Sequence, residues 1–259
     1  MDNQDGLKEF LHRLEHPALW LDTSGGISLG PLHGLEEFKK TIPRILPSLD
    51  GLICSPGQIR RLNNITNSDA ALLVRMDWTN TLRDASFPLP PLNPKHLSIL
   101  EPKDALGLRA NGMVVNLLLG YEECIEAHCL KVAVQLALSG RQLGFPLIVE
   151  VRPGGPRVSM FGKAVELGAS LAQECGADMI VVPYSDLDSI QTIATMVTVP
   201  WLLKPSSVAT TITEWETSRA LGSAGVWIDH TWLTTNFPLN ELAEYLHTSP
   251  QTIETIYEH

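Results

Sequence analysis

A lysine closes an otherwise apolar run in the C-terminal half of the chain. Lys204 directly follows the run Val199–Leu203, so part of its side chain is expected to be desolvated. Desolvation favours the neutral amine, which can attack a carbonyl carbon and form a Schiff base. Two other interpretations stay open, namely a clamp for an anionic ligand and a structural ion pair.

The anion-clamp interpretation involves two hydroxyl residues just after that run. Ser206 and Ser207 stand at the start of a helix predicted over Ser207–Leu221, where serine is a favoured N-cap residue. The free N–H groups at a helix start bind phosphate or carboxylate. The sequence therefore predicts an anion site beside the ammonium group of Lys204.

Groups for proton transfer stand at the ends of two other apolar runs. Asp22 ends the first run, and Asp229 with His230 ends the last. A carboxylate can orient an imidazole for acid–base work. Adjacent residues on a strand point to opposite faces, so Asp229 and His230 pair only if the strand has already ended. An inward Asp229 would instead partner Lys204.

A second group of polar strand ends is expected to bind substrate. Arg152 is the candidate for holding a carboxylate or phosphate, and Glu150, Asp77 and Tyr184 complete the predicted group. Each of these residues also has an ordinary interpretation as a solvated or paired side chain. Arg75 and Asn116 occupy comparable strand-end positions without an assigned role.

Other kinds of site lack a signature in the sequence. A metal centre would require distant residues such as Asp77 and His230 to converge, because the chain has no short-spaced metal-ligand motif. No GxSxG motif supports a serine or cysteine nucleophile. We therefore expect neither a metal nor another cofactor at the active site.

Eight apolar runs must position these groups. They are continuous rather than alternating, as expected for parallel strands covered on both faces. Helix-like segments separate them, so the strand ends should meet on one side of a sheet. The predicted strands are Pro17–Asp22, Asp50–Ser55, Ala70–Asp77, Gly112–Leu119, Pro146–Arg152, Asp178–Tyr184, Val199–Lys204 and Gly225–Asp229.

This rhythm predicts an α/β fold, a single (β/α)8 TIM barrel over residues 1–259. Residues Gly6–Glu15 predict an additional N-terminal helix, and Trp78–Pro102, which contains the Pro-rich run Phe87–Pro94, predicts a long irregular loop after the third strand. That loop is either a cover for the active site or a rigid surface excursion. A doubly wound sheet is the alternative fold, but no GxGxxG follows any strand.

Composition limits the partners. The chain has 259 residues and a formal net charge of −10, so nucleic acid and anionic membranes are not expected partners. No run approaches the roughly 18 apolar residues that a membrane span requires. Residues 1–5 show no signal-peptide pattern. We expect a cytoplasmic protein with a small-molecule substrate, and reduced, mostly buried cysteines at Cys54, Cys124, Cys129 and Cys175.

Four segments share a pattern with one enzyme family. They are Gly26–Pro31 with Gly34-Leu35, Gly176–Ile180, Val199–Leu203 and Gly222–Ile228. They resemble the class I aldolases of the DeoC/LacD/FbaB superfamily, in particular the DhnA-type branch. The first segment is the most specific, because it is similar to that family's D-H-G-x-S-x-G-P loop. The resemblance spans roughly residues 17–237. It implies a TIM barrel, a Schiff-base lysine on the sixth strand, and homo-oligomers.

The positions that the resemblance marks as functional differ here. The loop's Asp-His aligns with Ser24-Gly25, two residues after Asp22, and the acid–base tyrosine aligns at about Arg152. The Schiff-base lysine aligns with Val181. The phosphate-binding Gly-Gly aligns with Pro205-Ser206, and a Gly-Arg pair aligns with Asp229-His230. The resemblance thus implies an aldolase barrel with a remodelled site.

We therefore expect a carbon–carbon lyase that acts on a small carbonyl metabolite, which carries a carboxylate or a phosphate. Lys204 would form the imine or polarise the carbonyl, and Asp229, His230 and Asp22 would transfer protons. An isomerase or decarboxylase on the same scaffold is a close alternative. The alternative from another class is a catalytically inactive pseudo-aldolase that binds a metabolite or a protein partner.

Overall fold

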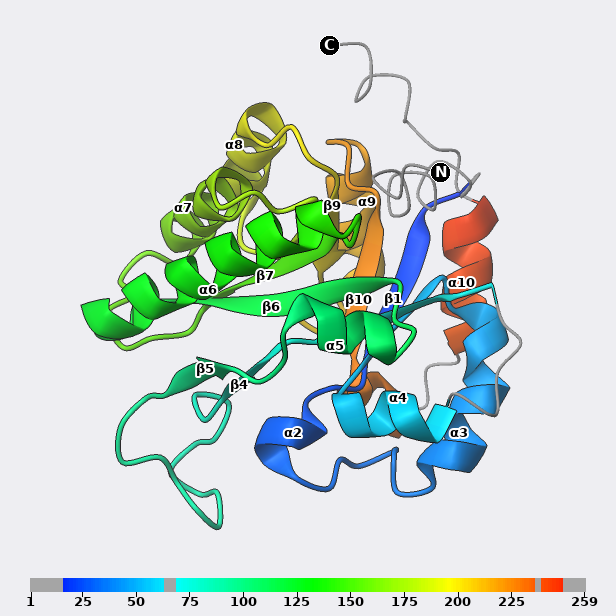
Figure 1. Cartoon of the computed structure of the whole chain (residues 1–259). Coiled ribbons are helices and arrows are strands. Elements are labelled where there is room, and N and C mark those ends of the chain that lie inside the picture. Colours follow the sequence, from blue (N-terminus) through cyan, green and yellow to red (C-terminus); the bar gives the residue numbers. More distant parts are fainter. Residues whose placement is uncertain (1–15, 63–68, 236–238, 249–259) are drawn as a thin grey trace.

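Eight parallel strands form a closed barrel in the computed structural model, which describes residues 16–62, 69–235 and 239–248 (Figure 1). Neighbouring strands follow the chain order, and the last pairs with the first. This confirms the predicted (β/α)8 TIM barrel. Its strands are β1 (Ala18–Asp22), β2 (Gly51–Cys54), β3 (Ala71–Arg75), β6 (Gly112–Leu119), β7 (Leu147–Pro153), β8 (Met179–Pro183), β9 (Trp201–Lys204) and β10 (Gly225–Asp229).

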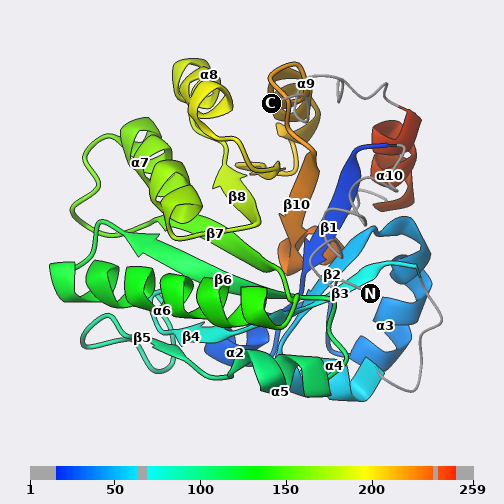
Figure 2. The ribbon, with the colours of Figure 1, turned by 45° about the horizontal axis from the view of Figure 1, so that its top comes forward.

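Helices cover the outside of the barrel, as Figures 1 and 2 show. None of the described helices is both long and apolar enough to cross a membrane. The helix predicted over Gly6–Glu15 lies outside the described residues. The helices are α2 (Gly26–Leu29), α3 (Phe38–Ile45), α4 (Pro56–Leu62), α5 (Pro102–Gly107), α6 (Glu123–Gln142), α7 (Phe161–Glu174), α8 (Leu187–Met196), α9 (Thr211–Arg219) and α10 (Leu239–Thr248), with 3-10 turns η2 (Leu46–Ser48) and η3 (His230–Thr234).

The stretch after β3 contains more regular structure than its prolines suggested. Strands β4 (Asp77–Thr79) and β5 (His96–Ser98) pair antiparallel outside the barrel, and α5 follows them. The third barrel strand therefore ends at Arg75, and Asp77 begins β4 instead of ending β3. The prolines lie between β4 and β5, where no ladder needs their missing N–H groups.

The helix after β9 begins later than predicted. Helix α9 starts at Thr211, with Thr210 at its N-cap. Ser206 and Ser207 lie in the preceding loop, so the expected N-cap role for these residues is wrong. Pro205 and the hydrogen bonds of Ser206 to Glu214 hold this loop outside the helix.

Large side chains fill the barrel interior. Trp20 and Trp227 come from neighbouring strands and place their ring centroids 6.2 Å apart. Gly51 on β2 makes room for them, because a Cβ atom there would lie 2.6 Å from the Trp20 ring. This packed apolar layer closes the barrel beneath the carboxyl ends of the strands.

Above this apolar layer the inward-facing residues become polar. Side chains alternate along each strand, so residues two positions beyond the apolar layer also point inward. On β7, Ile148 belongs to the interior cluster and Glu150 follows it two positions later. The corresponding inward layer contains Asp22, Arg75, Asn116, Glu150, Lys204 and Asp229.

The four cysteines are free thiols, as expected, and Cys124 is the exposed one.

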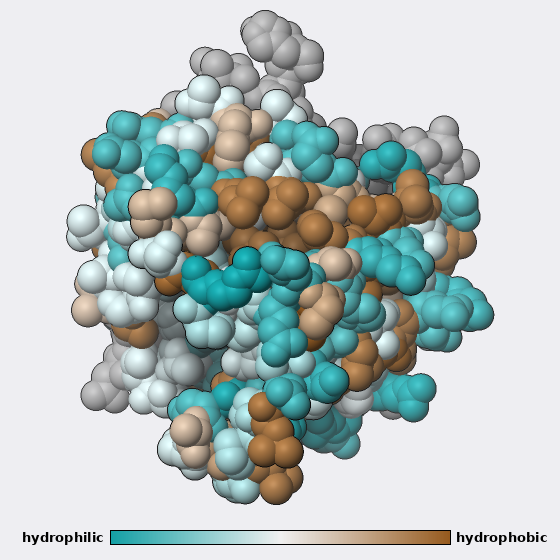
Figure 3. All heavy atoms as spheres, turned by 90° about the vertical axis from the view of Figure 1, so that its left-hand side faces the viewer, coloured by the Kyte–Doolittle hydropathy of each residue, from teal (hydrophilic) through white to brown (hydrophobic). Residues whose placement is uncertain are grey.

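Apolar side chains reach the surface on one side of the molecule, as the apolar atoms in Figure 3 show. Val134 and Leu138 of α6 and Leu167 of α7 are among the exposed apolar residues. The homo-oligomer stays a prediction.

Candidate active site

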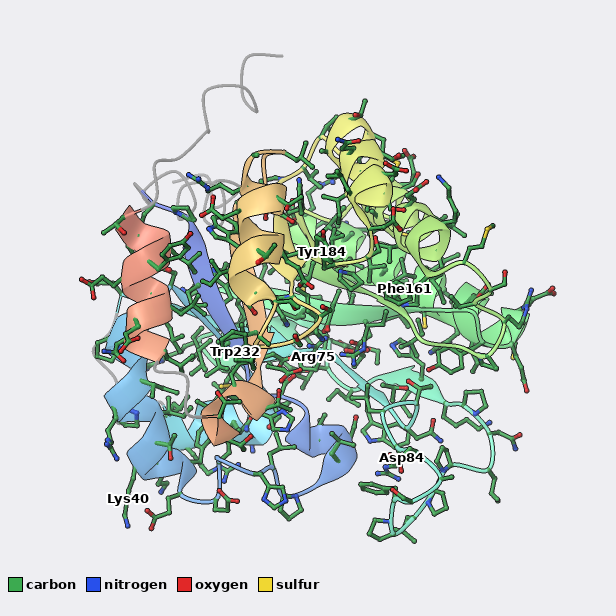
Figure 4. The ribbon with its side chains drawn as sticks, turned by 180° about the vertical axis from the view of Figure 1, so that it is seen from behind. Lys40, Arg75, Asp84, Phe161, Tyr184 and Trp232 are labelled. Carbon is green, nitrogen blue, oxygen red and sulfur yellow. The ribbon has the colours of Figure 1, made fainter. Side chains whose placement is uncertain are left out.

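A cavity of about 240 Å³ opens at the carboxyl ends of the barrel strands. This is the end at which TIM barrels place their chemistry. Figure 4 shows Arg75 inside the ribbon of the barrel, whereas Asp84 lies out on the Pro-rich excursion. The cavity is lined by Asp22, Ser24, Gly25, Ile27, Ser28, Leu29, Arg75, Asp77, Leu82, Asn116, Arg152, Lys204, Asp229, His230 and Thr231.

Arg75 is the centre of the polar layer. Its Nη2 donates to Asp22 Oδ2 at 2.6 Å and to Glu150 Oε2 at 2.8 Å. Its Nε donates to Ser24 Oγ at 3.0 Å, and its Nη1 donates to Asn116 Oδ1 at 3.1 Å. Burial opposes its charge, but Asp22 and Glu150 raise the pKa of Arg75 above its usual value. Arg75 therefore carries a permanent positive charge, and it connects its own strand β3 to β1, β6 and β7.

The same network holds the loop after β1 in place. Asp22 Oδ1 accepts hydrogen bonds from Ser24 N at 2.7 Å and from Ser24 Oγ at 2.5 Å. Its other oxygen is engaged by Arg75. Both carboxylate oxygens of Asp22 thus have donors, which suits Asp22 for holding the loop against β3.

Glu150 is a fully buried carboxylate surrounded by three cations. Oε1 accepts hydrogen bonds from Lys204 Nζ at 2.7 Å and from Arg152 Nη1 at 2.9 Å, while Oε2 accepts from Arg75. Burial favours the neutral acid, but Lys204, Arg152 and Arg75 together hold the pKa of Glu150 well below its usual range. Glu150 does not line the cavity itself, so it acts through the cations that it positions.

Lys204 reaches Glu150 across one intervening strand. Lys204 is on β9 and Glu150 is on β7, and β8 lies between them with Val181 in register with Glu150. Val181 belongs to the buried interior cluster and offers no polar atom. The Lys204 side chain is 20% exposed and lines the cavity. The amine of Lys204 is therefore accessible to a ligand. It comes from β9, whereas the family resemblance places a lysine on the neighbouring strand β8, at position 181.

Asp229 and His230 meet at the cavity wall because the strand ends between them. Strand β10 stops at Asp229, and η3 begins at His230. Asp229 Oδ1 accepts from the Thr231 N–H at 2.9 Å, which caps this turn. The ring of His230 has no hydrogen-bond partner among the described residues and lies beside Gly25, 3.8 Å from where a Cβ would stand. Its nitrogens are thus available to a ligand.

Asp77 is joined by a histidine that sequence reasoning missed. His96 Nε2 donates to Asp77 Oδ2 at 2.8 Å, and neither side chain is exposed. The same oxygen accepts two hydrogen bonds from Asn116. Burial opposes the charge of His96, but the bond to Asp77 and the adjacent Cys129 raise the pKa of His96 to about 9. His96 was missed because it lies in the stretch Trp78–Pro102, which the sequence predicted to be an irregular loop.

One oxygen of Asp77 is left without a donor. Asp77 lines the cavity, and its buried Oδ1 has no hydrogen-bond partner among the described residues. A buried carboxylate oxygen without a donor is costly, so such an atom calls for a ligand or a water molecule. Asp77 is thus an acid of the cavity lining with one carboxylate oxygen that lacks a donor among the described residues.

Besides Glu150, three further predicted binding residues lie outside the cavity lining. Ser206 donates its N–H to Glu214 Oε2 at 2.8 Å, and its hydroxyl donates to the same carboxylate. Ser207 bonds to Thr210 in the loop before α9. Tyr184 follows the end of β8 and packs against the hydrophobic core. The structure therefore does not bring these three residues to the cavity.

Comparison with known proteins gives one curated relative and several structural neighbours. No family model matches the chain. The chain is 22% identical over 220 residues to 2-amino-3,7-dideoxy-D-threo-hept-6-ulosonate synthase 1 of Archaeoglobus fulgidus, covering 84% of this chain and 80% of that protein. The similarity thus extends over most of both proteins.

The solved structures share the barrel. An archaeal fructose 1,6-bisphosphate aldolase superposes with a TM-score of 0.78 at 17% identity, covering 95% of this chain and 100% of the other. A second archaeal structure, whose catalytic lysine is covalently bound to the carbinolamine intermediate of the substrate, gives a TM-score of 0.77 at 17% identity over 95% and 99% of the two chains. The sequence similarity and the shared barrel agree with the resemblance to the DhnA-type class I aldolases that the sequence motifs indicate, and the solved structures by themselves show the barrel fold.

Proposed function

We propose that the protein is an aldolase-like lyase whose imine-forming amine is Lys204. The observation that carries this proposal is the position of Lys204, which lines the cavity and reaches Glu150 across β8, over the apolar Val181. The amine group lies within the same polar layer that a lysine at position 181 would enter. The function thus depends on an amine supplied by β9 instead of β8.

The chemistry follows from the nucleophilicity of a neutral amine. Lys204 Nζ would add to a substrate carbonyl carbon, and loss of water from the carbinolamine would give a protonated imine. That cation withdraws electrons from the adjacent carbon–carbon bond, which can then break or form. Arg75 and Arg152 share the Glu150 carboxylate with Lys204, so this carboxylate is not a partner of the Lys204 amine alone.

His230 is the best-placed residue for proton transfer. Its ring lines the cavity without a partner among the described side chains, whereas Asp22 is engaged by Arg75 and Ser24. Asp229 lies beside Asp22 in the strand register and caps the turn that carries His230. We therefore assign proton transfer to His230, with Asp229 and Asp22 fixing the surrounding loops.

The cavity favours a small substrate with a single anionic group. Its volume of about 240 Å³ lies just below the range of roughly 300–1,000 Å³ that is usual for ligand sites. Arg152 is 27% exposed and can bind a carboxylate or phosphate through its free guanidinium nitrogens. The Ser206 N–H, by contrast, is already bonded to Glu214. This arrangement supports one anionic group near Arg152 rather than a sugar bisphosphate.

Borohydride reduction tests the imine directly. We would incubate the protein with a panel of aldehydes, ketones and keto acids, reduce it, and locate adducts by intact-protein mass and peptide mapping. An adduct on Lys204 that is lost in Lys204→Ala supports the proposal. Lys163→Ala is the matched control, because Lys163 pairs with Glu166 on the surface of α7. An adduct that persists in Lys204→Ala would place the chemistry elsewhere.

A binding function is the second candidate, and one observation favours it. Lys204 Nζ donates to Glu150 Oε1 at 2.7 Å, so the Lys204 side chain already has an ionic partner inside the protein. A pseudo-aldolase of this kind would bind a carboxylate or phosphate metabolite without forming an adduct. Saturable binding by calorimetry that is lost in Arg152→Ala, with no trapped imine for any carbonyl compound, would support this function over the lyase.

A further inference from the structure

Two histidines and an aspartate converge at the opposite end of the barrel from the cavity. His16 precedes β1, Asp50 precedes β2, and His247 lies in the last turn of α10. One ligand atom from each of the three side chains lies within 4.8 Å of the others. Because barrel chemistry occupies the carboxyl ends of the strands, this cluster is separate from the candidate active site.

The two imidazole rings lie against each other, and both approach the carboxylate of Asp50. Their centroids are 3.7 Å apart with an interplanar angle of 32°. His247 Nε2 lies 3.1 Å from Asp50 Oδ2, and His16 Nε2 lies 4.0 Å from Asp50 Oδ1. Both rings therefore direct the same type of nitrogen toward Asp50.

Neighbouring backbone groups fix the orientation of two of these side chains. His16 Nδ1 donates to the Pro17 carbonyl at 3.3 Å, so Nδ1 carries the proton and Nε2 of a neutral ring presents a lone pair. The Leu19 N–H donates to Asp50 Oδ2 at 2.7 Å, which holds the carboxylate and leaves Oδ1 toward His16. A metal-binding histidine usually makes such a hydrogen bond through its other nitrogen.

From this arrangement we infer that His16, Asp50 and His247 form a binding site for a divalent transition-metal ion such as Zn²⁺. Imidazole nitrogen and carboxylate oxygen are ligands of these ions. Tetrahedral zinc, with bonds of about 2.0–2.1 Å, holds its ligand atoms about 3.3 Å apart. The ligand atoms lie within 4.8 Å of one another, so metal binding would draw them closer by side-chain rotation.

The site leaves room for solvent at the metal. The side chains of His16 and His247 are 27% and 30% exposed, and that of Asp50 is 10% exposed. Ions can therefore enter from water, and a water molecule completes the coordination. The metal would tie the segment before β1 to α10, which is a structural role at the amino end of the barrel.

Metal titration tests the site. We would measure Zn²⁺ binding to the full-length protein by competition with a chromophoric chelator, and record the visible absorption of the Co²⁺ form. We expect one ion per chain and a melting temperature that rises with Zn²⁺. His16→Ala and His247→Ala should each weaken binding at least tenfold and abolish the Zn²⁺-dependent rise.

His33→Ala is the matched control, because His33 is an exposed histidine that pairs with Glu36 on the surface. It should bind Zn²⁺ as the unmodified protein does. His247→Gln, with folding checked by circular dichroism without metal, separates loss of the ligand from loss of the fold. Absence of saturable Zn²⁺ binding, or unchanged binding in both alanine variants, would overturn the assignment. The three side chains would then only contact one another, without a metal ion.

Discussion

At the scale of single residues, Glu150 is the group on which the candidate site depends. It is fully buried and accepts hydrogen bonds from Lys204, Arg152 and Arg75. A buried carboxylate of this kind neutralises charges that would otherwise be stranded in a low-dielectric environment. Its contribution to stability is therefore inseparable from its contribution to the geometry of the cavity.

Glu150→Gln should destabilise the protein strongly. The amide keeps the shape but removes the negative charge, so three cations are left without their shared partner. We expect the free energy of unfolding in urea to fall by about 3–5 kcal/mol. Glu36→Gln, at an exposed surface pair, should leave it nearly unchanged. Equal effects of the two substitutions would contradict the buried network.

The Asp77–His96 pair predicts a pH dependence of stability. His96 has a folded-state pKa of about 9, above its ordinary value of 6.5. Its contribution of about 3 kcal/mol is therefore fully present below pH ~6.5 and is lost as pH rises through about 9. The free energy of unfolding, measured at pH 6 and pH 9.5, should fall more in the unmodified protein than in His96→Gln. Identical pH profiles would show that His96 is neutral when folded.

At the scale of elements, the excursion between β4 and β5 borders the cavity. Leu82 lines the cavity, and Arg83 Nε donates to the Ser28 carbonyl of α2 at 2.8 Å. The Arg83 guanidinium also lies over the rings of Trp78 and Phe87, at 5.7 and 5.1 Å from their centroids. Of the two alternatives for this stretch, these contacts favour a cover for the site over a rigid surface excursion.

Arg83→Ala should weaken ligand binding without unfolding the barrel. Loss of the Ser28 contact and of both ring contacts would release Leu82 from the cavity wall. We expect a several-fold rise in the dissociation constant for a bound metabolite, with the melting temperature lowered by only a few degrees. Lys39→Ala, on the exposed side of α3, should alter neither quantity. An unchanged dissociation constant in Arg83→Ala would make the excursion a surface feature.

At the scale of the whole molecule, the barrel is closed by interior packing that leaves little room for added atoms. The rings of Trp20 and Trp227 fill the space beneath the polar layer, and Gly51 provides the clearance for Trp20. This packing separates the two ends of the barrel, so the cavity and the His16–Asp50–His247 cluster are expected to behave independently.

Gly51→Ala tests that packing. The new methyl group would lie 2.6 Å from the Trp20 ring, which must shift within a filled interior. We expect a loss of about 1–3 kcal/mol in the free energy of unfolding, measured in urea. Gly57→Ala is the control, because no atom lies within 4 Å of the added carbon in α4. A loss in Gly57→Ala as large as in Gly51→Ala would argue against a close-packed interior.

The sequence by itself determined the barrel and the approximate place of its strands, because apolar periodicity and helix–strand alternation are local signals, although the third strand ends at Arg75 and not at Asp77. It also indicated Lys204, Arg152 and Asp229 as strand-end groups, and these residues line one cavity. It placed Ser206 at a helix start, where the structure instead has it bonded to Glu214. Local pattern thus identified the candidates without assigning their partners.

Only the tertiary structure decided which of these groups meet. Lys204 and Glu150 are 54 positions apart, and their contact depends on strand register and on the small side chain of the intervening Val181. The place of His96 beside Asp77 depends in the same way on the pairing of β4 with β5. Such contacts arise from the closure and tilt of the whole barrel, which no short stretch of sequence encodes.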